Sequence, residues 1–156
     1  MFLFTNSHLG HYPGDGAIAD FINISGTNLT CIELDPKLWR VLAQEYAHLA
    51  NHPRHPVTVI LGDFLKHSGL YDRIVMNPPS IFLSEIDHIM HAWDCLKPEG
   101  RIVSVASASV TFHRAKKAKE FREFVAQHGS IEPFLPGSFR ESGTMENTVM
   151  VVLDKP

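Results

Sequence analysis

Cysteine is scarce in this sequence, with two residues of that type among 156. Cys31 and Cys95 stand far apart, without metal-ligand spacing, and each lies in an apolar run. We therefore expect two buried free thiols rather than a disulfide or a metal site. This cysteine usage indicates a reducing, cytoplasmic setting.

Excess charge and long apolar runs are also lacking. The formal net charge is −3, so no overall basic field attracts nucleic acid, although a local patch is not excluded. The start of the chain, "MFLFTNSH", has no positive leader, and no later run approaches the length of a membrane span, which predicts a soluble protein without a membrane partner. At 156 residues and 44% apolar, the chain fits one domain, residues 1–156.

Apolar strand-like runs alternate with helical patterns along the chain. Strands are predicted at 28–34, 57–61, 72–76, 100–110 and 147–154, and helices at 35–50, 83–96 and 114–129. Asp35 and Ser84 are the candidate N-caps of the first two helices, and Gly129 stops the third. The alternation predicts an α/β fold, a doubly wound and mainly parallel sheet with helices on both faces.

Ligands of such sheets bind beyond the carboxyl ends of the strands. After a candidate first strand, "MFLF", comes "PGDGAIADFI", where Gly14 and Gly16 let the backbone approach a ligand and a helix start offers free N–H groups. Glu33 ends the second strand and can accept both hydroxyls of a ribose. A solvated acid that caps the next helix is an equally good interpretation of Glu33 and a better one of Asp35.

The next two strands end in the stretches "GDFL" and "IVMNPPS". Asp63 can accept a hydrogen bond from an exocyclic amine, and Phe64 can lie against a purine face; the alternative is a turn acid beside a core phenylalanine. The fourth strand runs directly into Asn77, Pro78 and Pro79. That combination is more specific than any other strand end in the chain.

From about residue 13 to residue 154, the sequence resembles the class I S-adenosylmethionine-dependent methyltransferases, and within them the amino-group methyltransferases with an Asn-Pro-Pro-aromatic motif. The similarity is greatest to small phage and prophage enzymes, on the stretches "CIELDP", "GDFL", "YDRIVMNPP", "IDHIMHAWDCLKPEGRIV" and "GSFRESGTMENTVMVV". The resemblance implies a Rossmann-like seven-stranded sheet with a reversed final hairpin. It also implies an S-adenosylmethionine site formed by Gly14, Gly16, Glu33, Asp63 and Phe64, and methyl transfer to a nitrogen held at Asn77.

The physical chemistry of the motif agrees with this role. A nitrogen conjugated to a ring or a carbonyl is a poor nucleophile, so placing it in line with the methyl donor is the main task. The Asn77 side-chain oxygen and the Pro78 carbonyl can each accept one N–H of the target and stabilise the positive charge that develops. These two acceptors make a strong base unnecessary. Pro78 and Pro79 fix φ and lack N–H donors, so the loop is stiff and the Pro78 carbonyl has no competing local hydrogen bond.

The substrate and the activity are left with alternatives. Adenine in DNA is the favoured target, flipped out of the duplex to reach Asn77, with RNA or a protein glutamine as further candidates. Ser80 stands where the family has a stacking aromatic residue; Phe82 could replace that ring, but neither residue matches the motif, so no family role is assigned to either. The stretch "TNSHLGHY" stands where the family has a clean strand that ends in an acid. A non-catalytic protein of the same fold that acts as a binding or partner subunit is therefore the alternative function.

Two other groups of residues suggest sites. Histidines 48, 52 and 55 have spacing interrupted by prolines, so solvated loop histidines are expected and no metal is predicted. The segment "HRAKKAKEFR" (113–122) carries six basic side chains that could contact phosphate. An exposed amphipathic helix face with Glu120 and Glu123 interleaved explains that segment equally well.

Overall fold

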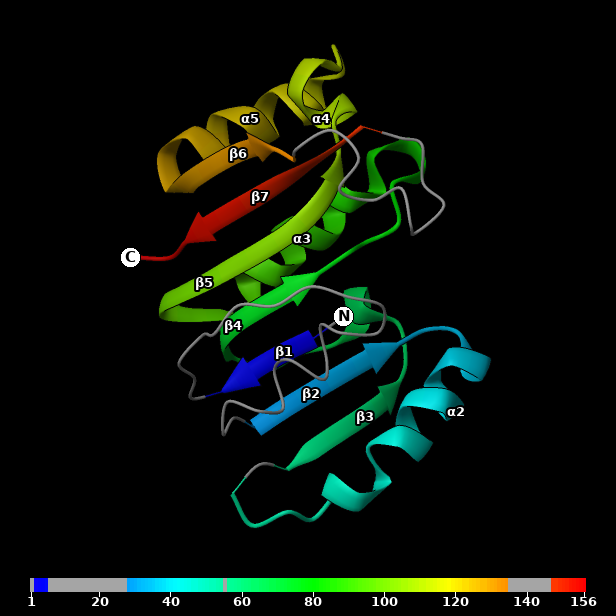
Figure 1. Ribbon diagram of the computed structural model, residues 1–156. Coiled ribbons are helices and arrows are strands. Elements are labelled where there is room, and N and C mark those ends of the chain that lie inside the picture. The colour runs from blue at the N-terminus through cyan, green and yellow to red at the C-terminus, as the bar shows by residue number, and fades with distance from the viewer. Residues whose placement is uncertain (1, 6–27, 55, 135–146) are drawn as a thin grey trace.

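The computed structural model of the chain describes residues 2–5, 28–54, 56–134 and 147–156 (Figure 1). The strands are β1 Phe2–Thr5, β2 Asn28–Glu33, β3 Val57–Leu61, β4 Tyr71–Met76, β5 Leu96–Ser107, β6 Gly129–Pro133 and β7 Thr148–Asp154. The α-helices are α2 Pro36–Glu45, α3 Ser84–Asp94, α4 Ser109–Phe112 and α5 Lys116–His128, with 3₁₀ turns η1 Ala47–Leu49, η2 Phe64–Lys66 and η3 Ile81–Leu83.

The seven strands form one sheet in the order β3-β2-β1-β4-β5-β7-β6. β2 pairs with β3 in parallel and β4 pairs with β5 in parallel, whereas β7 is antiparallel to both β5 and β6. The predicted fold class, a mainly parallel α/β sheet with an antiparallel final hairpin, is confirmed. Because β2, β3, β4, β5 and β6 point the same way, their carboxyl ends share one edge of the sheet.

β1 runs in the opposite direction to its neighbours. It pairs antiparallel with β2 and with β4, and its last residue, Thr5, lies beside Asn28, the first residue of β2. The candidate first strand, "MFLF", was expected to run toward the carboxyl edge and precede the glycine turn, but β1 ends at the other edge. The facing sides of β2 and β4 both need backbone partners. A short apolar strand supplies these in either direction, so the residue pattern of β1 does not encode which one.

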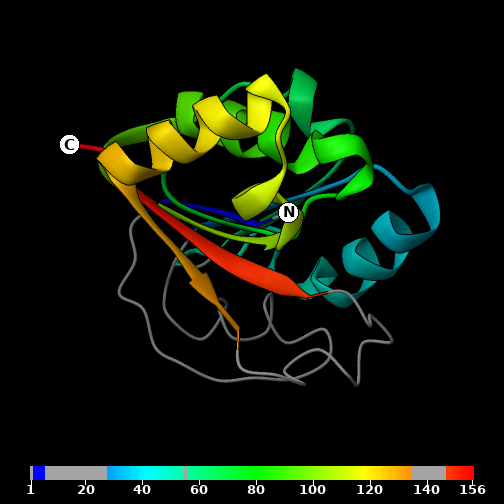
Figure 2. The same ribbon diagram turned by 90° about the horizontal axis from the view of Figure 1, so that it is seen from above.

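The helices lie on both faces of the sheet (Figures 1 and 2). α3 and α5 cover one face, where Ile74, Ile102 and Leu153 are fully buried beneath them. α2 covers the opposite face at the β2–β3 side, where its C-cap Tyr46 packs with Leu29. Alternate residues of a strand point to opposite faces, which is why β2 contributes to both clusters.

The predicted helices differ from the observed ones mainly at their ends. Asp35 caps α2 as predicted, accepting from the Lys37 N–H at 2.7 Å. The prediction that Ser84 caps α3 is wrong, because Leu83 holds that position in a left-handed conformation and Ser84 is the first helical residue. Gly129 ends α5 as predicted and also begins β6, a strand that the periodicity did not indicate. The strand predicted at 100–110 ends at Ser107 and is followed by α4.

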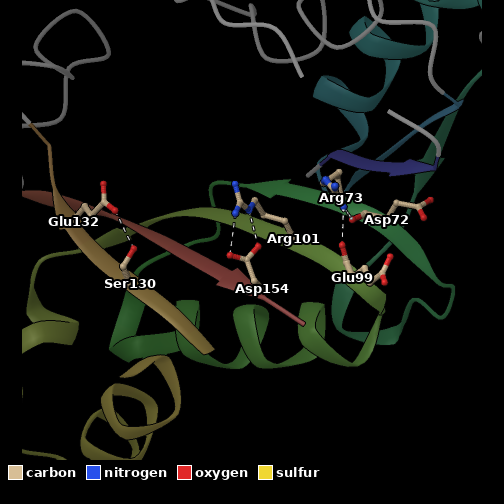
Figure 3. Close-up of polar contacts among 7 residues, drawn as sticks. All are labelled: Asp72, Arg73, Glu99, Arg101, Ser130, Glu132 and Asp154. Carbon is tan, nitrogen blue, oxygen red and sulfur yellow. Dashed lines mark hydrogen bonds and ion pairs between the residues drawn. The ribbon is translucent and has the colours of Figure 1, made fainter. Parts of the chain in front are cut away.

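Charged pairs gather where β4 and β5 begin and β7 ends, opposite the carboxyl edge (Figure 3). Arg101 donates two hydrogen bonds to Asp154, at 2.6 and 3.0 Å, and so joins β5 to β7. This pair lowers the pKa of Asp154 and raises that of Arg101. Arg73 donates to the Glu99 carbonyl at 3.1 Å. These contacts hold the sheet together at the edge that does not carry the candidate site.

Candidate functional site

The carboxyl edge of the sheet brings the predicted site residues to neighbouring strand ends. The Gly62 N–H donates to the Glu33 carbonyl at 2.9 Å, which places the ends of β2 and β3 side by side. Asn77 directly follows β4, on the other side of the slot that β1 occupies. With strands spaced about 4.8 Å apart, β2 and β4 lie roughly 10 Å from each other. Glu33 and Asn77 therefore lie at the carboxyl ends of the two strands that flank β1.

Glu33 and Asp35 form a compact turn after β2. The Asp35 N–H donates to Glu33 Oε1 at 2.8 Å, while Asp35 itself caps α2. The cap interpretation of Asp35 is thereby confirmed. Glu33 is half-buried, and its carboxylate has a second oxygen that can accept from a ribose hydroxyl.

Asp63 and Phe64 follow β3 in a similar way. Asp63 caps η2 by accepting from the Leu65 N–H at 3.0 Å. Phe64 is only 6% exposed and packs edge-on against His91, with ring centroids 4.9 Å apart. The ring thus belongs to the core, as the alternative interpretation held, and only a small part of it is open to a ligand.

The glycine turn predicted to complete this site lies outside the described residues. Gly14 and Gly16 fall within residues 6–27, so their role stays a prediction.

Asn77 is exposed at the end of β4, and the two prolines behind it differ in their surroundings. Pro78 is buried, and no described residue donates to its carbonyl. The Pro79 carbonyl accepts a hydrogen bond from the Ser84 hydroxyl at 2.7 Å. Exposed Asn77 thus precedes a carbonyl, that of Pro78, to which no described residue donates, while the carbonyl of Pro79 fixes the loop.

The loop after the prolines contains a feature that the sequence analysis missed. Phe82 and Leu83 both have left-handed backbones, with φ of 52° and 61°, although neither is glycine. Leu83 is buried in the main core, whereas Phe82 is 97% exposed. No residue type in "SIFLS" signals this conformation, because it arises from anchoring on both sides of the turn. Ser80, where an aromatic residue was expected, is exposed and precedes the turn.

Polar groups are packed behind this loop. Glu85, in the first turn of α3, has no exposed surface, in a position where the helix dipole favours a carboxylate. The His88 ring donates a hydrogen bond from Nδ1 to the Ser84 carbonyl, 2.8 Å away. Burial lowers the pKa of His67, whose ring lies 2.8 Å from the Tyr71 hydroxyl, and nearby His91 lowers it further. Apart from helical spacing, the residue pattern contains no signal that predicts this packing.

The remaining candidates carry structural rather than chemical roles. Both cysteines are free and buried, and burial raises the pKa of Cys31 to about 12, which makes it a poor nucleophile.

Among the described residues, no three His, Cys, Asp or Glu side chains gather as metal ligands. No described helix has the length and apolarity needed to cross a membrane.

The three lysines of the basic segment 113–122 each form an ion pair with a neighbouring carboxylate. Its ion pairs join Lys116 to Glu120, Lys117 to Asp87 and Lys119 to Glu123. Arg122 donates to the carbonyls of Val110 and His113, and so closes the turn between α4 and α5. This pattern favours the amphipathic-face interpretation over a dedicated phosphate site.

The fold is shared with known methyltransferases. No protein-family model matches the chain, and no curated protein matches it. Among solved structures, the N-methyltransferase NodS from Bradyrhizobium japonicum WM9 is similar over 81% of this chain and 72% of its own, with 14% identity and a TM-score of 0.53. The M protein of the type I restriction enzyme EcoKI is similar over 80% of this chain, with 16% identity and a TM-score of 0.60, but the match covers only 30% of that protein.

Proposed function

We propose that this protein transfers a methyl group from S-adenosylmethionine to an exocyclic or amide nitrogen, with adenine in DNA as the favoured target. One observation carries the proposal: Asn77 is exposed at the carboxyl end of β4, beside a Pro78 carbonyl to which no described residue donates, and across the β1 slot from Glu33. The shared fold with an N-methyltransferase supports nitrogen as the acceptor. The M protein of a restriction enzyme, which has the same fold, supports DNA.

The residues at the ends of β2 and β3 suit the cofactor. Glu33 would accept from the ribose hydroxyls through its second oxygen, and Asp63 from the adenine amine. Phe64 would offer the edge of a largely buried ring, and Gly14 and Gly16 would let the backbone approach the methionine end. When bound, S-adenosylmethionine supplies an electrophilic methyl group on a sulfonium.

Asn77 and Pro78 position the acceptor nitrogen. The Asn77 side-chain oxygen accepts one N–H of the target, and the Pro78 carbonyl accepts the other. Both acceptors lie on a stiff loop, since Pro78 is buried and Ser84 holds the Pro79 carbonyl at 2.7 Å. As the N–C bond forms and the S–C bond of the sulfonium would break, the nitrogen gains positive charge, which the two oxygens stabilise. The cationic product then releases its extra proton to solvent, so neither oxygen has to act as a base.

Methyl transfer from radiolabelled S-adenosylmethionine to DNA, RNA and protein tests the proposal. We expect label in DNA with the native chain and a loss of about 100-fold or more with Asn77→Ala, in the range found when one transition-state hydrogen bond is removed. Asn147→Ala is a matched control, because Asn147 is also an exposed asparagine at this edge of the sheet but is not one of the proposed site residues. Transfer that survives Asn77→Ala would refute the role given to Asn77, and label in RNA or protein alone would replace DNA as the substrate.

A non-catalytic role as a binding or partner subunit is the second candidate. Two observations favour it: Ser80 provides no ring at the motif, and β1 ends at the edge opposite the site. Calorimetry with S-adenosylhomocysteine, the demethylated cofactor, separates the two functions. Failure to bind at millimolar concentration would exclude the enzymatic proposal and leave the non-catalytic one.

A further inference from the structure

Phe82 has the largest exposed fraction among the large apolar side chains that the structure describes. The residue is 97% exposed, compared with 70% for Phe112 and 68% for Ile81. It lies at the carboxyl edge, on the turn between β4 and α3, five positions after Asn77. Leaving a whole phenyl ring in water is unfavourable, so this placement calls for an explanation.

The backbone holds the ring in solvent by a constrained turn. Phe82 and Leu83 are consecutive left-handed residues, a conformation that side chains with a Cβ rarely adopt. The turn is anchored by buried Pro78 before it and by its own second residue, Leu83, which is buried in the core. The hydrogen bond from Ser84 to the Pro79 carbonyl, 2.7 Å long, closes the turn. Strained conformations of this kind persist where surrounding contacts impose them, and they concentrate at ligand sites.

We propose that Phe82 is the stacking residue of this site and that its ligand is a nucleobase in an unpaired strand. The inference rests on the proposed function and deepens it, because it selects a nucleobase over the amide of a protein glutamine. Phe82 is not at the position of the motif's aromatic residue, which Ser80 occupies. The ring instead comes from Phe82, two positions later on the same loop, where the left-handed turn leaves it exposed.

The chemistry of the loop fits a base better than a side-chain amide. A nucleobase with an exocyclic amine has both a hydrogen-bonding edge and a broad π-face. The edge matches the Asn77 amide and the Pro78 carbonyl, and the face matches an exposed phenyl ring. A glutamine amide offers the same edge but almost no face. The base must lie outside a duplex stack, because a paired base has both of its faces covered.

Binding of labelled oligonucleotides tests this inference. The probes are a single-stranded oligodeoxyadenylate and an abasic strand of equal length, compared by fluorescence anisotropy. We expect the native chain to prefer the oligodeoxyadenylate by roughly 5- to 150-fold, the range that one base stacked on an aromatic ring provides. Phe82→Ala should lose most of that preference, and Phe82→Tyr should keep it within about threefold. Phe112→Ala is the matched control, since Phe112 is also an exposed phenylalanine but belongs to α4 and not to the loop that follows β4.

The outcomes separate this inference from the proposed function. Equal preference in the native chain and in Phe82→Ala, or no oligonucleotide binding by the native chain, would overturn the stacking role. S-adenosylhomocysteine calorimetry on the same samples reports the cofactor site independently. If the base preference depends on Phe82 while no cofactor binds, the stacking role stands and the enzymatic proposal fails. A loss of preference in Phe112→Ala equal to that in Phe82→Ala would also overturn the assignment to Phe82.

Discussion

At the scale of single residues, the loop after β4 separates anchoring side chains from presented ones. Pro78 and Leu83 are buried and fix the loop, whereas Asn77 and Phe82 are exposed. Left-handed backbone costs about 1–2 kcal/mol per residue that carries a Cβ. Two such residues in succession use a considerable part of the ~5–15 kcal/mol that keeps a typical domain folded. The arrangement is therefore expected to serve binding rather than stability.

Replacing Phe82 by glycine should separate these two effects. Phe82→Gly removes the strain at φ 52° but increases the freedom of the unfolded chain, so we expect the free energy of unfolding to rise by a net of about 0.5–1 kcal/mol. Urea unfolding measures the change. Ile81→Gly is the control, because Ile81 is similarly exposed but has no positive φ, and glycine there should destabilise the protein by about 0.5–1 kcal/mol. Equal destabilisation by both variants would contradict the assignment of strain to Phe82.

At the scale of elements, Gly129 joins α5 directly to β6 with no residue between them. The strand begins against β7, where Gly129 is paired with Leu153. A Cβ at this position would lie 1.8 Å from the Val152 carbonyl oxygen, a backbone atom that cannot move without disturbing the β6–β7 ladder. Close backbone contact, and not a special dihedral angle, is what requires glycine here.

Gly129→Ala should therefore destabilise the protein by about 2 kcal/mol, as insertion of an extra carbon into a packed site does. Gly62→Ala, at the end of β3, is a matched control: the nearest atom to its Cβ would be 3.8 Å away, so we expect a change within about 0.5 kcal/mol. Thermal unfolding followed by circular dichroism measures both. A melting temperature for Gly129→Ala equal to that of Gly62→Ala would show that the ladder shifts easily to admit the side chain.

At the scale of the whole molecule, the sequence predicts the strands of the sheet but not the direction of β1 or the exposed turn at Phe82. The strands from β2 to β5 and the edge that carries Asn77, Glu33 and Asp63 follow from apolar periodicity and strand-end chemistry. The direction of β1 does not, because a four-residue strand carries the same pattern either way. The exposure of Phe82 does not either, since it depends on how distant core contacts fix Pro78 and Leu83. Local pattern encodes the elements, and packing decides the strained turns between them.

The two halves of the sheet are joined chiefly through β1, which pairs with β2 on one side and with β4 on the other. The main core also crosses this junction, since Ile32 of β2 and Phe64 of η2 pack in the same cluster as Leu153 of β7. Shared packing of this kind couples the unfolding of neighbouring elements. We therefore predict that the chain, as a single domain, unfolds in one cooperative transition.

The two tryptophans test this prediction, because each reports one half of the sheet. Trp39 in α2 donates to the Val59 carbonyl of β3 at 3.2 Å, while Trp93 in α3 packs edge-on against Phe124 of α5 at 5.0 Å. In Trp93→Phe the remaining fluorescence comes from Trp39, and in Trp39→Phe it comes from Trp93. Within each variant, the urea midpoint from fluorescence should coincide with the midpoint from far-ultraviolet circular dichroism, whatever the substitution does to overall stability. If the Trp39 fluorescence changes at a lower urea concentration than the circular dichroism signal, the β2–β3 half unfolds separately. The pairing of β1 with β2 and β4 would then be too weak to make the chain one cooperative domain.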